Sequence, residues 1–189
     1  MAHSSPVQGI TSKFNGKIMK LALTDLQERY NAGERHFAGI ILEHRFGASV
    51  TLKDADLSGI DLSGANLTGM RLEKTNLSGA KLVGACLCSS VLIDVNLIQA
   101  DLGDANLRRC RWLRVDLSNA HMGGAIFCES KLRNANLFYT DLEQALLIRS
   151  TLRGAINTEP FRIWGAFVAH LIMPDGTLDE GPRFVDYPD

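Results

Sequence analysis

The segments Ala55-Asp56-Leu57-Ser58-Gly59 and Ala65-Asn66-Leu67-Thr68-Gly69 decide the fold of this chain, because they show a five-residue unit in undiluted form. From Leu52 to Leu152 every fifth residue is large and apolar, over 21 positions without an exception. Eighteen of these residues are Leu, and ten of the residues two places earlier are Ala. A period of five fits neither the 3.6 residues of a helical turn nor the 2 of a strand. It predicts a square coil in which each unit forms one short side and then turns a corner.

Four units complete one turn of this coil, so residues 20 apart are expected to stack on neighbouring coils, about 4.8 Å apart. Leu52, Leu72 and Leu92 would form one inward column, and 21 units give about five regular coils. Gly in the fifth place of a unit, as at Gly59, eases a tight turn. Asp or Asn before the Leu can bond nearby backbone at the corner, so most acidic residues of the array have a structural use.

Both ends of such a coil expose apolar core and unpaired strand edges, so we expect a cap at each end. At the N-terminal end, a short strand is expected within residues 17–24. Thr24 and Gln27 then have the spacing of a capping box and Gly33 is a helix stop, which predicts a helix over residues 25–32.

The C-terminal cap is predicted from residues 161–172, whose apolar cluster has a spacing that permits an amphipathic helix. Its end, Ala169-His170-Leu171-Ile172-Met173, also fits one further five-residue unit. We therefore expect a helix followed by a coil.

These patterns divide the chain into three parts. Residues 1–36 form an N-terminal segment with the capping helix, residues 37–155 form the coil, which is regular from residue 50, and residues 156–189 form the C-terminal cap and tail. The first coil is expected to be irregular around residues 44–49, because Gly47 stands where the next Leu is due. Residues 1–16 and 181–189 are expected to be loose ends.

The composition is that of one globular domain: 189 residues, 46% of them hydrophobic, with a net charge of -1 at pH 7. This near balance of charge gives no argument for a DNA or membrane partner. The segment 1–30 contains no basic start followed by a long apolar run, so we expect neither a secretory signal nor a spanning helix. A cytoplasmic monomer is therefore expected.

The four cysteines agree with that location. Cys86, Cys88 and Cys128 are predicted to point outward, and Cys110 inward. Cys88 and Cys128 would lie two coils apart, about 9–10 Å, which exceeds the ~7 Å limit for the Cα atoms of a disulfide. A bridge across Cys86-x-Cys88 would be strained, so reduced thiols are expected. No second Cys or His pair stands at the spacing of a zinc site.

One face of the predicted coil combines basic and apolar residues among its outward positions. Stacked like charges about 5 Å apart repel, so the fold itself does not need this clustering. Apolar residues rimmed by Arg are typical of an interaction patch, whereas a solvated face with scattered apolar residues is the other interpretation. The candidate protein-binding residues are Arg71, Val91, Ile93, Arg111, Leu113, Arg114, Lys131 and Arg133.

A second face carries Ile126, Leu146 and Ile148 near its C-terminal end. Exposed apolar clusters are costly, so residues 161–172 are expected to fold back over these side chains.

A third face stacks Asp101, His121 and Asp141 in one column. An acid–His–acid row can bind a metal or tune a general base. Such rows arise easily in a repeat that favours Asp before Leu, and a convex wall lacks the concavity that catalysis uses. We therefore predict no catalytic, metal or cofactor site.

The unit resembles that of the pentapeptide-repeat family, A(D/N)LXX, continuously over residues 50–154. Residues 26–35 and 172–177 also resemble the flanks of cyanobacterial members. The resemblance implies an all-β solenoid, the right-handed quadrilateral β-helix, and a role in binding or regulating other proteins. It also implies an alternative, a DNA mimic that modulates gyrase. That role needs a strongly acidic surface, whereas residues 50–154 carry 12 Lys and Arg against 11 Asp and Glu and have no long inserted loop.

The sequence contains no Ser/His/Asp arrangement, phosphate-binding loop or metal motif. We therefore expect a non-enzymatic scaffold for protein–protein interaction, with a protein partner of unknown identity, no cofactor and no direct nucleic-acid binding.

Overall fold

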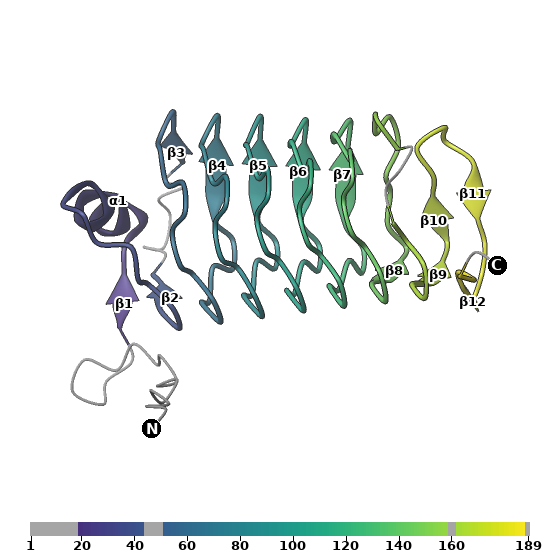
Figure 1. Ribbon diagram of the computed structural model, residues 1–189, viewed down its shortest axis with the longest axis horizontal. Coiled ribbons are helices and arrows are strands. Elements are labelled where there is room, and N and C mark those ends of the chain that lie inside the picture. Colours follow the sequence, from purple (N-terminus) through teal and green to yellow (C-terminus); the bar gives the residue numbers. More distant parts are fainter. Residues whose placement is uncertain (1–18, 44–50, 159–161, 188–189) are drawn as a thin grey trace, which may run out of the picture.

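The computed structural model describes residues 19–43, 51–158 and 162–187 and forms an elongated β-solenoid with a short helix at its N-terminal end (Figure 1). The chain winds in parallel coils, and successive coils pair along four sides. This confirms the predicted quadrilateral β-helix.

One side of the solenoid is a five-stranded parallel sheet. Its strands are β3 (Leu52–Lys53), β4 (Arg71–Glu73), β5 (Val91–Ile93), β6 (Arg111–Leu113) and β7 (Lys131–Arg133). Leu72 pairs with Leu92, which confirms that four units complete one turn. The other three sides pair through β-bridges at the same interval, as Asn76 does with Asn96.

The large residue of each unit points into the solenoid and stacks between its counterparts on the two neighbouring coils. Leu97 is fully buried, and its counterparts Leu77 and Leu117 are at most 1% exposed. The adjacent bridge between Asn76 and Asn96 brings Leu77 and Leu97 together as predicted. Large residues on the coils therefore form a continuous core, since water is excluded from the whole length of the array.

The corners are tight turns, which explains the glycines of the repeat. The amide of Ile60 donates to the carbonyl of Leu57 across one such corner, and Gly59 between them has a φ of 65°. Glycine adopts this left-handed conformation without a steric cost. The same corner holds a non-glycine residue elsewhere, as at Tyr139, whose φ is 51°.

The N-terminal end is covered by α1 (Leu23–Asn31), and β1 (Lys20–Leu21) pairs in parallel with β2 (Ile41–Leu42). The predicted strand and cap are confirmed, because the apolar face of α1 is buried and the Tyr30 hydroxyl donates to the Ser58 carbonyl at 2.7 Å.

The predicted capping box is wrong. The helix begins at Leu23, its N-cap is Ala22, and no side chain caps it. Leu23 and Leu26 are both buried, and the Leu26 amide donates to the Ala22 carbonyl at 3.0 Å. Burial of Leu23 therefore places the helix start two positions before the one that Thr24 and Gln27 predict.

The first turn of the chain is longer than the regular ones. His36 pairs with Asp61 and Ile41 with Asn66, 25 residues apart, where residues on the regular coils pair 20 apart. The predicted irregularity around residues 44–49 lies outside the described residues.

The C-terminal end is built from strands. These are β8 (Leu146–Ile148), β9 (Phe167–Ala169), β10 (Leu171–Ile172), β11 (Leu178–Asp179) and β12 (Arg183–Phe184). The predicted helix is wrong for the described residues 162–172, which form a further coil. A helix there would leave the edge of β8 unpaired, whereas β9 pairs with β8 in parallel.

The register of this last coil also differs from that of the five-residue unit expected at residues 169–173. Asn136 still pairs with Ile156, four units later, but Asp141 pairs with Arg162, one position beyond four units. One extra residue therefore lies between Ile156 and Arg162. As a result, Leu171 occupies a corner position, fully buried, rather than the centre of a unit.

The chain end closes the last coil. β11 pairs antiparallel with β10, and β12 pairs antiparallel with β9. The expectation of a loose tail is therefore wrong for Arg183 and Phe184, because their backbone supplies a partner for the outer edge of β9.

Candidate protein-binding wall

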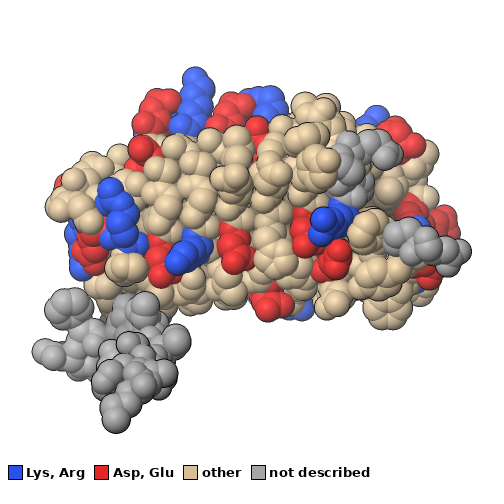
Figure 2. Space-filling model, in the orientation of Figure 1, with Lys and Arg blue, Asp and Glu red and all other residues tan. Residues whose placement is uncertain are grey.

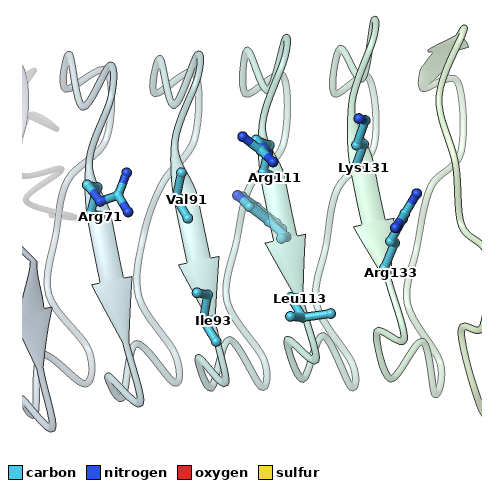
Figure 3. Close-up of a pocket in the computed structure, with 8 residues that line it drawn as sticks. Arg71, Val91, Ile93, Arg111, Leu113, Lys131 and Arg133 are labelled. Carbon is cyan, nitrogen blue, oxygen red and sulfur yellow. The ribbon is translucent and has the colours of Figure 1, made fainter.

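The backbone of β4 to β7 places the predicted residues on one wall. In each of these strands the middle residue points inward and its two neighbours point outward. The pairing register produces two outward rows that run along the solenoid (Figure 3). One row is Arg71, Val91, Arg111 and Lys131, and the other is Glu73, Ile93, Leu113 and Arg133.

Seven of the eight predicted residues line a single hollow, with a volume of about 370 Å³. Val91 is short and stands between the long side chains of Arg71 and Arg111 (Figure 3). Ile93 and Leu113 are register neighbours and half-buried. The hollow is lined by Arg71, Val91, Ile93, Arg111, Trp112, Leu113, Lys131 and Arg133.

Trp112 is the lining residue that the sequence prediction omits. Its side chain is 1% exposed, and its indole Nε1 donates to the Ser90 hydroxyl at 3.0 Å. The available signal was a Trp at an inward position otherwise occupied by Leu, within the same face. Its ring points into the solenoid, behind the two outward rows, and its one polar group is satisfied there.

Arg114 is the predicted residue that lies outside the hollow. Its guanidinium donates two hydrogen bonds to Asp94, at 2.6 and 2.8 Å. These hydrogen bonds hold the pKa of the Asp94 carboxyl below its ordinary value. Arg114 is therefore already paired within the protein.

The basic residues of the hollow differ from Arg114 in their charge environment. Among the described residues, Arg71, Arg111, Lys131 and Arg133 form no ion pair. Beside them, Glu73 is paired with Lys53 at 2.7 Å. The hollow thus has an apolar centre and a rim of cations whose charges are not neutralised by the protein. We call the outward surface formed by these lining residues the basic wall.

The acid–His–acid row is only partly assembled. His121 Nδ1 lies 3.2 Å from an Asp141 carboxylate oxygen, whereas the Asp101 carboxylate accepts the Gly103 amide at 3.1 Å. Within the described part of the chain, no group of three or more His, Cys, Asp or Glu side chains could hold a metal ion. The row therefore amounts to one exposed His–Asp pair and a turn residue.

The second apolar face is extended by the C-terminal segment, not covered by it, so that prediction is wrong. Ile126 pairs with Leu146, and Leu146 with Phe167 of β9. Phe184 of β12 follows with an edge-to-face contact to Phe167 and is 66% exposed. The extra strands continue the wall because they join its edge.

The short α1 is the helix found in the described residues, and it is neither long nor apolar enough to cross a membrane.

Comparisons with known proteins bear on the repeat. The sequence model of the family described as pentapeptide repeats matches eight copies, over residues 55–94, 96–134 and 113–147. No curated protein matches the chain.

Several solved structures are similar to it. HetL, a pentapeptide repeat protein involved in heterocyst differentiation regulation from the cyanobacterium Nostoc sp. strain PCC 7120, is 22% identical, with 84% of this chain and 100% of that chain covered and a TM-score of 0.40. Another pentapeptide repeat protein of Nostoc PCC 7120, alr5209, is 30% identical, with 66% and 84% covered and a TM-score of 0.24. A trypsin-treated form of QnrB1, a plasmid-mediated fluoroquinolone resistance protein, is 22% identical, with 73% and 65% covered and a TM-score of 0.49.

Proposed function

Because the chain belongs to the pentapeptide-repeat family, we propose that it is a protein-binding scaffold without catalytic activity, whose basic wall binds an acidic partner protein. In this proposal it acts as a monomer in the cytoplasm, a reducing compartment that fits its four free cysteines. A solenoid suits this role, since its rigid wall presents side chains at fixed intervals.

The observation that carries the proposal is the pairing of Arg111 with Lys131. These two residues are register neighbours on β6 and β7, so two side chains of like charge are paired across adjacent strands. Like charges in register destabilise a sheet. Elsewhere residues one turn apart carry opposite charges, as in the pair of Arg109 and Glu129 at 2.9 Å. A residue of opposite charge one turn away is therefore enough to neutralise a charge in this repeat. Arg111 and Lys131 have no such neighbour in each other.

The chemistry of the basic wall indicates the surface it would bind. Arg residues bind carboxylates through two parallel hydrogen bonds, and the rim offers three of them. The apolar centre, with Ile93 and Leu113 side by side, would be desolvated by an apolar side chain of the partner. We therefore propose a partner surface on which carboxylates surround one apolar residue. Its association should be steered by charge and weakened by salt, mainly through the on-rate.

The alternative is a DNA mimic that modulates gyrase. It would require an acidic surface, but Lys and Arg are interspersed with Asp and Glu on the face drawn in Figure 2. The wall that does concentrate one charge is basic. Both observations favour a scaffold over a mimic.

The test is affinity capture from lysate of the native host, followed by titration of the purified captured protein. Two variants perturb the wall: Arg111→Glu reverses a rim charge, and Ile93→Ser with Leu113→Ser removes the apolar centre. Two matched controls change similar residues on other faces: Arg108→Glu, which is exposed, and Ile98→Ser, which is half-buried.

Both wall variants should abolish or strongly weaken binding, while both controls should bind like the wild type. All the changed positions point outward, so each protein should remain folded. The Arg111→Glu protein should even gain about 0.2–1 kcal/mol of stability, because its new carboxylate would face Lys131 with an opposite charge. Wild-type affinity in both wall variants would place the interface elsewhere and refute the proposal.

A further inference from the structure

Two thiols meet on a different face of the solenoid. Cys86 and Cys88 flank Leu87, which points inward and is buried, so both cysteines point outward. Their Sγ atoms lie 3.2 Å apart, and both side chains are half-buried free thiols. The proposed binding wall does not include either residue.

The repeat explains why the two sulfurs converge. Cys86 occupies the position before the central Leu, between Asn66 and Asn106 on the neighbouring coils. In those two coils the Asn side-chain oxygen turns back and accepts the amide two positions later, that of Thr68 at 3.2 Å and of Arg108 at 3.3 Å. Cys86 therefore holds its sulfur where the repeat normally holds an acceptor oxygen, and this direction leads to Cys88.

The surroundings divide the roles of the two thiols. Partial burial opposes ionisation of Cys86, but hydrogen bonds from the Thr68 hydroxyl, the Cys88 amide and the Cys88 thiol outweigh it and lower the pKa of Cys86. Burial, together with the neighbouring Cys86, raises the pKa of Cys88 to about 11. Cys86 is thus the more readily ionised thiol and the nucleophile of the pair, whereas Cys88 is the harder of the two to ionise.

We infer that Cys86 and Cys88 form a redox-active dithiol, which closes to an intrachain disulfide by exchange with a low-molecular-weight disulfide such as oxidised glutathione. The Cys86 thiolate attacks one sulfur of the reagent, the reagent's S–S bond breaks, and the first thiol leaves with a proton from water. Cys88 then gives its proton to water and attacks the Cys86 sulfur, which releases the second thiol. The two protein thiols lose two electrons in total, and one disulfide is reduced to two thiols.

The closed form should be easily reversed. Residues two apart in an extended chain span at most about 7 Å, which is at the upper end of the Cα separations found in disulfides, about 4.4–6.8 Å. Closing the bridge therefore strains the corner. Strained disulfides are readily reduced and are typical of regulatory rather than structural bonds.

The other two thiols are not positioned to form a disulfide with this pair. Cys110 is fully buried, and this burial raises the pKa of its thiol to about 12. Cys128 lies two coils from Cys88, at about 9–10 Å, too far for a disulfide.

A hollow next to the dithiol offers room for the incoming reagent. It has a volume of about 370 Å³ and is lined by Cys88, Ser89, Arg108, Arg109, Cys128 and Glu129. Arg109 is paired with Glu129, whereas Arg108 forms no ion pair among the described residues. Arg108 can therefore attract the carboxylates of an anionic thiol peptide such as glutathione.

The experiment treats the full-length reduced protein with oxidised glutathione and follows its intact mass and its free thiols. The variants are Cys86→Ser and Cys88→Ser, and Cys128→Ser serves as the control because it also points outward and is half-buried. The wild type and the control should each lose two thiols without retaining glutathione, and reduced glutathione should restore both thiols.

The two test variants distinguish the roles. The Cys88→Ser protein should keep one glutathione on Cys86, because no second thiol can release it. The Cys86→Ser protein should lose most of this reaction. Stable glutathionylation of the wild type to the same extent as Cys88→Ser would refute the dithiol, as would equal loss of thiols in the wild type and Cys86→Ser. A bond mapped to Cys128 would also refute it.

Discussion

Replacing Leu97 with Ala tests whether the columns of Leu are close-packed. Leu97 is fully buried at the middle of the array, with coils stacked on both sides. The change removes three carbon atoms, which at about 0.8 kcal/mol each gives a transfer cost of about 2.4 kcal/mol. A cavity adds to this cost, and coils held about 4.8 Å apart by backbone pairing cannot collapse to fill it. We therefore expect a total loss of about 3–5 kcal/mol.

The assay is equilibrium unfolding in urea, followed by circular dichroism. The midpoint should fall while the m-value stays constant, because the same surface is exposed on unfolding. Leu178→Ala is the matched control, since Leu178 is 52% exposed and its loss should change stability by no more than about 0.5 kcal/mol. A loss below about 1.5 kcal/mol for Leu97→Ala would mean that the column is loosely packed, and the reasoning about the core would be wrong.

Four further outcomes follow from the structure. Deletion of residues 162–189 should give aggregates or a new dimer in size-exclusion chromatography, because β8 loses its partner strand; an equally stable monomer would contradict this. Trp112→Phe should lower the unfolding free energy by about 1–3 kcal/mol, because the buried Ser90 hydroxyl loses its donor. The Arg114 guanidinium lowers the pKa of Asp94 from 3.8, so the stability that this pair provides is present above about pH 4 and lost as the pH falls further; Asp94→Asn should remove this part of the acid dependence of the urea midpoint. In a supercoiling assay, low-micromolar protein should neither inhibit gyrase nor protect it, and either effect would favour the DNA-mimic alternative.

Most of the array could be predicted because its period is a direct property of the sequence. Once four units make a turn, the neighbours of each residue are those four units away, and the burial of Leu97 and the register of Arg111 with Lys131 follow from counting. Few folds give this advantage, since contacts between distant residues are usually set by loops whose paths a sequence does not reveal.

The ends could not be predicted in the same way, because the 20-residue interval no longer gives the neighbours of a residue where the five-residue period is interrupted. The extra residue between Ile156 and Arg162 shifts the register of every later residue by one position. From the sequence alone, the apolar residues after it are compatible with a helix and with a coil in either of two registers. Pairing with β8 selects among these alternatives, and that pairing is a tertiary interaction. Likewise the start of α1 is set by burial of Leu23 and not by the local capping signal.

The candidate site was predictable only as a set of residues on one face. The register places seven of the eight residues together, with Arg114 just beyond β6, but it does not distinguish a paired Arg from an unpaired one. Arg114 donates to the Asp94 carboxylate one turn earlier, whereas the residue one turn before Arg111 is the uncharged Val91. The hollow itself depends on side-chain length, since Val91 stands between two Arg residues.

The regular turn of the solenoid places a simple constraint on charge. Each outward residue has one neighbour on the coil before it and one on the coil after it, so a single substitution is enough to pair an isolated charge. The pairs of Asp94 with Arg114 and of Arg109 with Glu129 use this route, and neither involves a change in the fold. Arg111 and Lys131 stand in the same relation and repel each other. A single substitution would remove this repulsion at the rim of the hollow, and its absence supports the proposal that these charges serve to bind an acidic partner, where the gain in binding would offset the cost in stability.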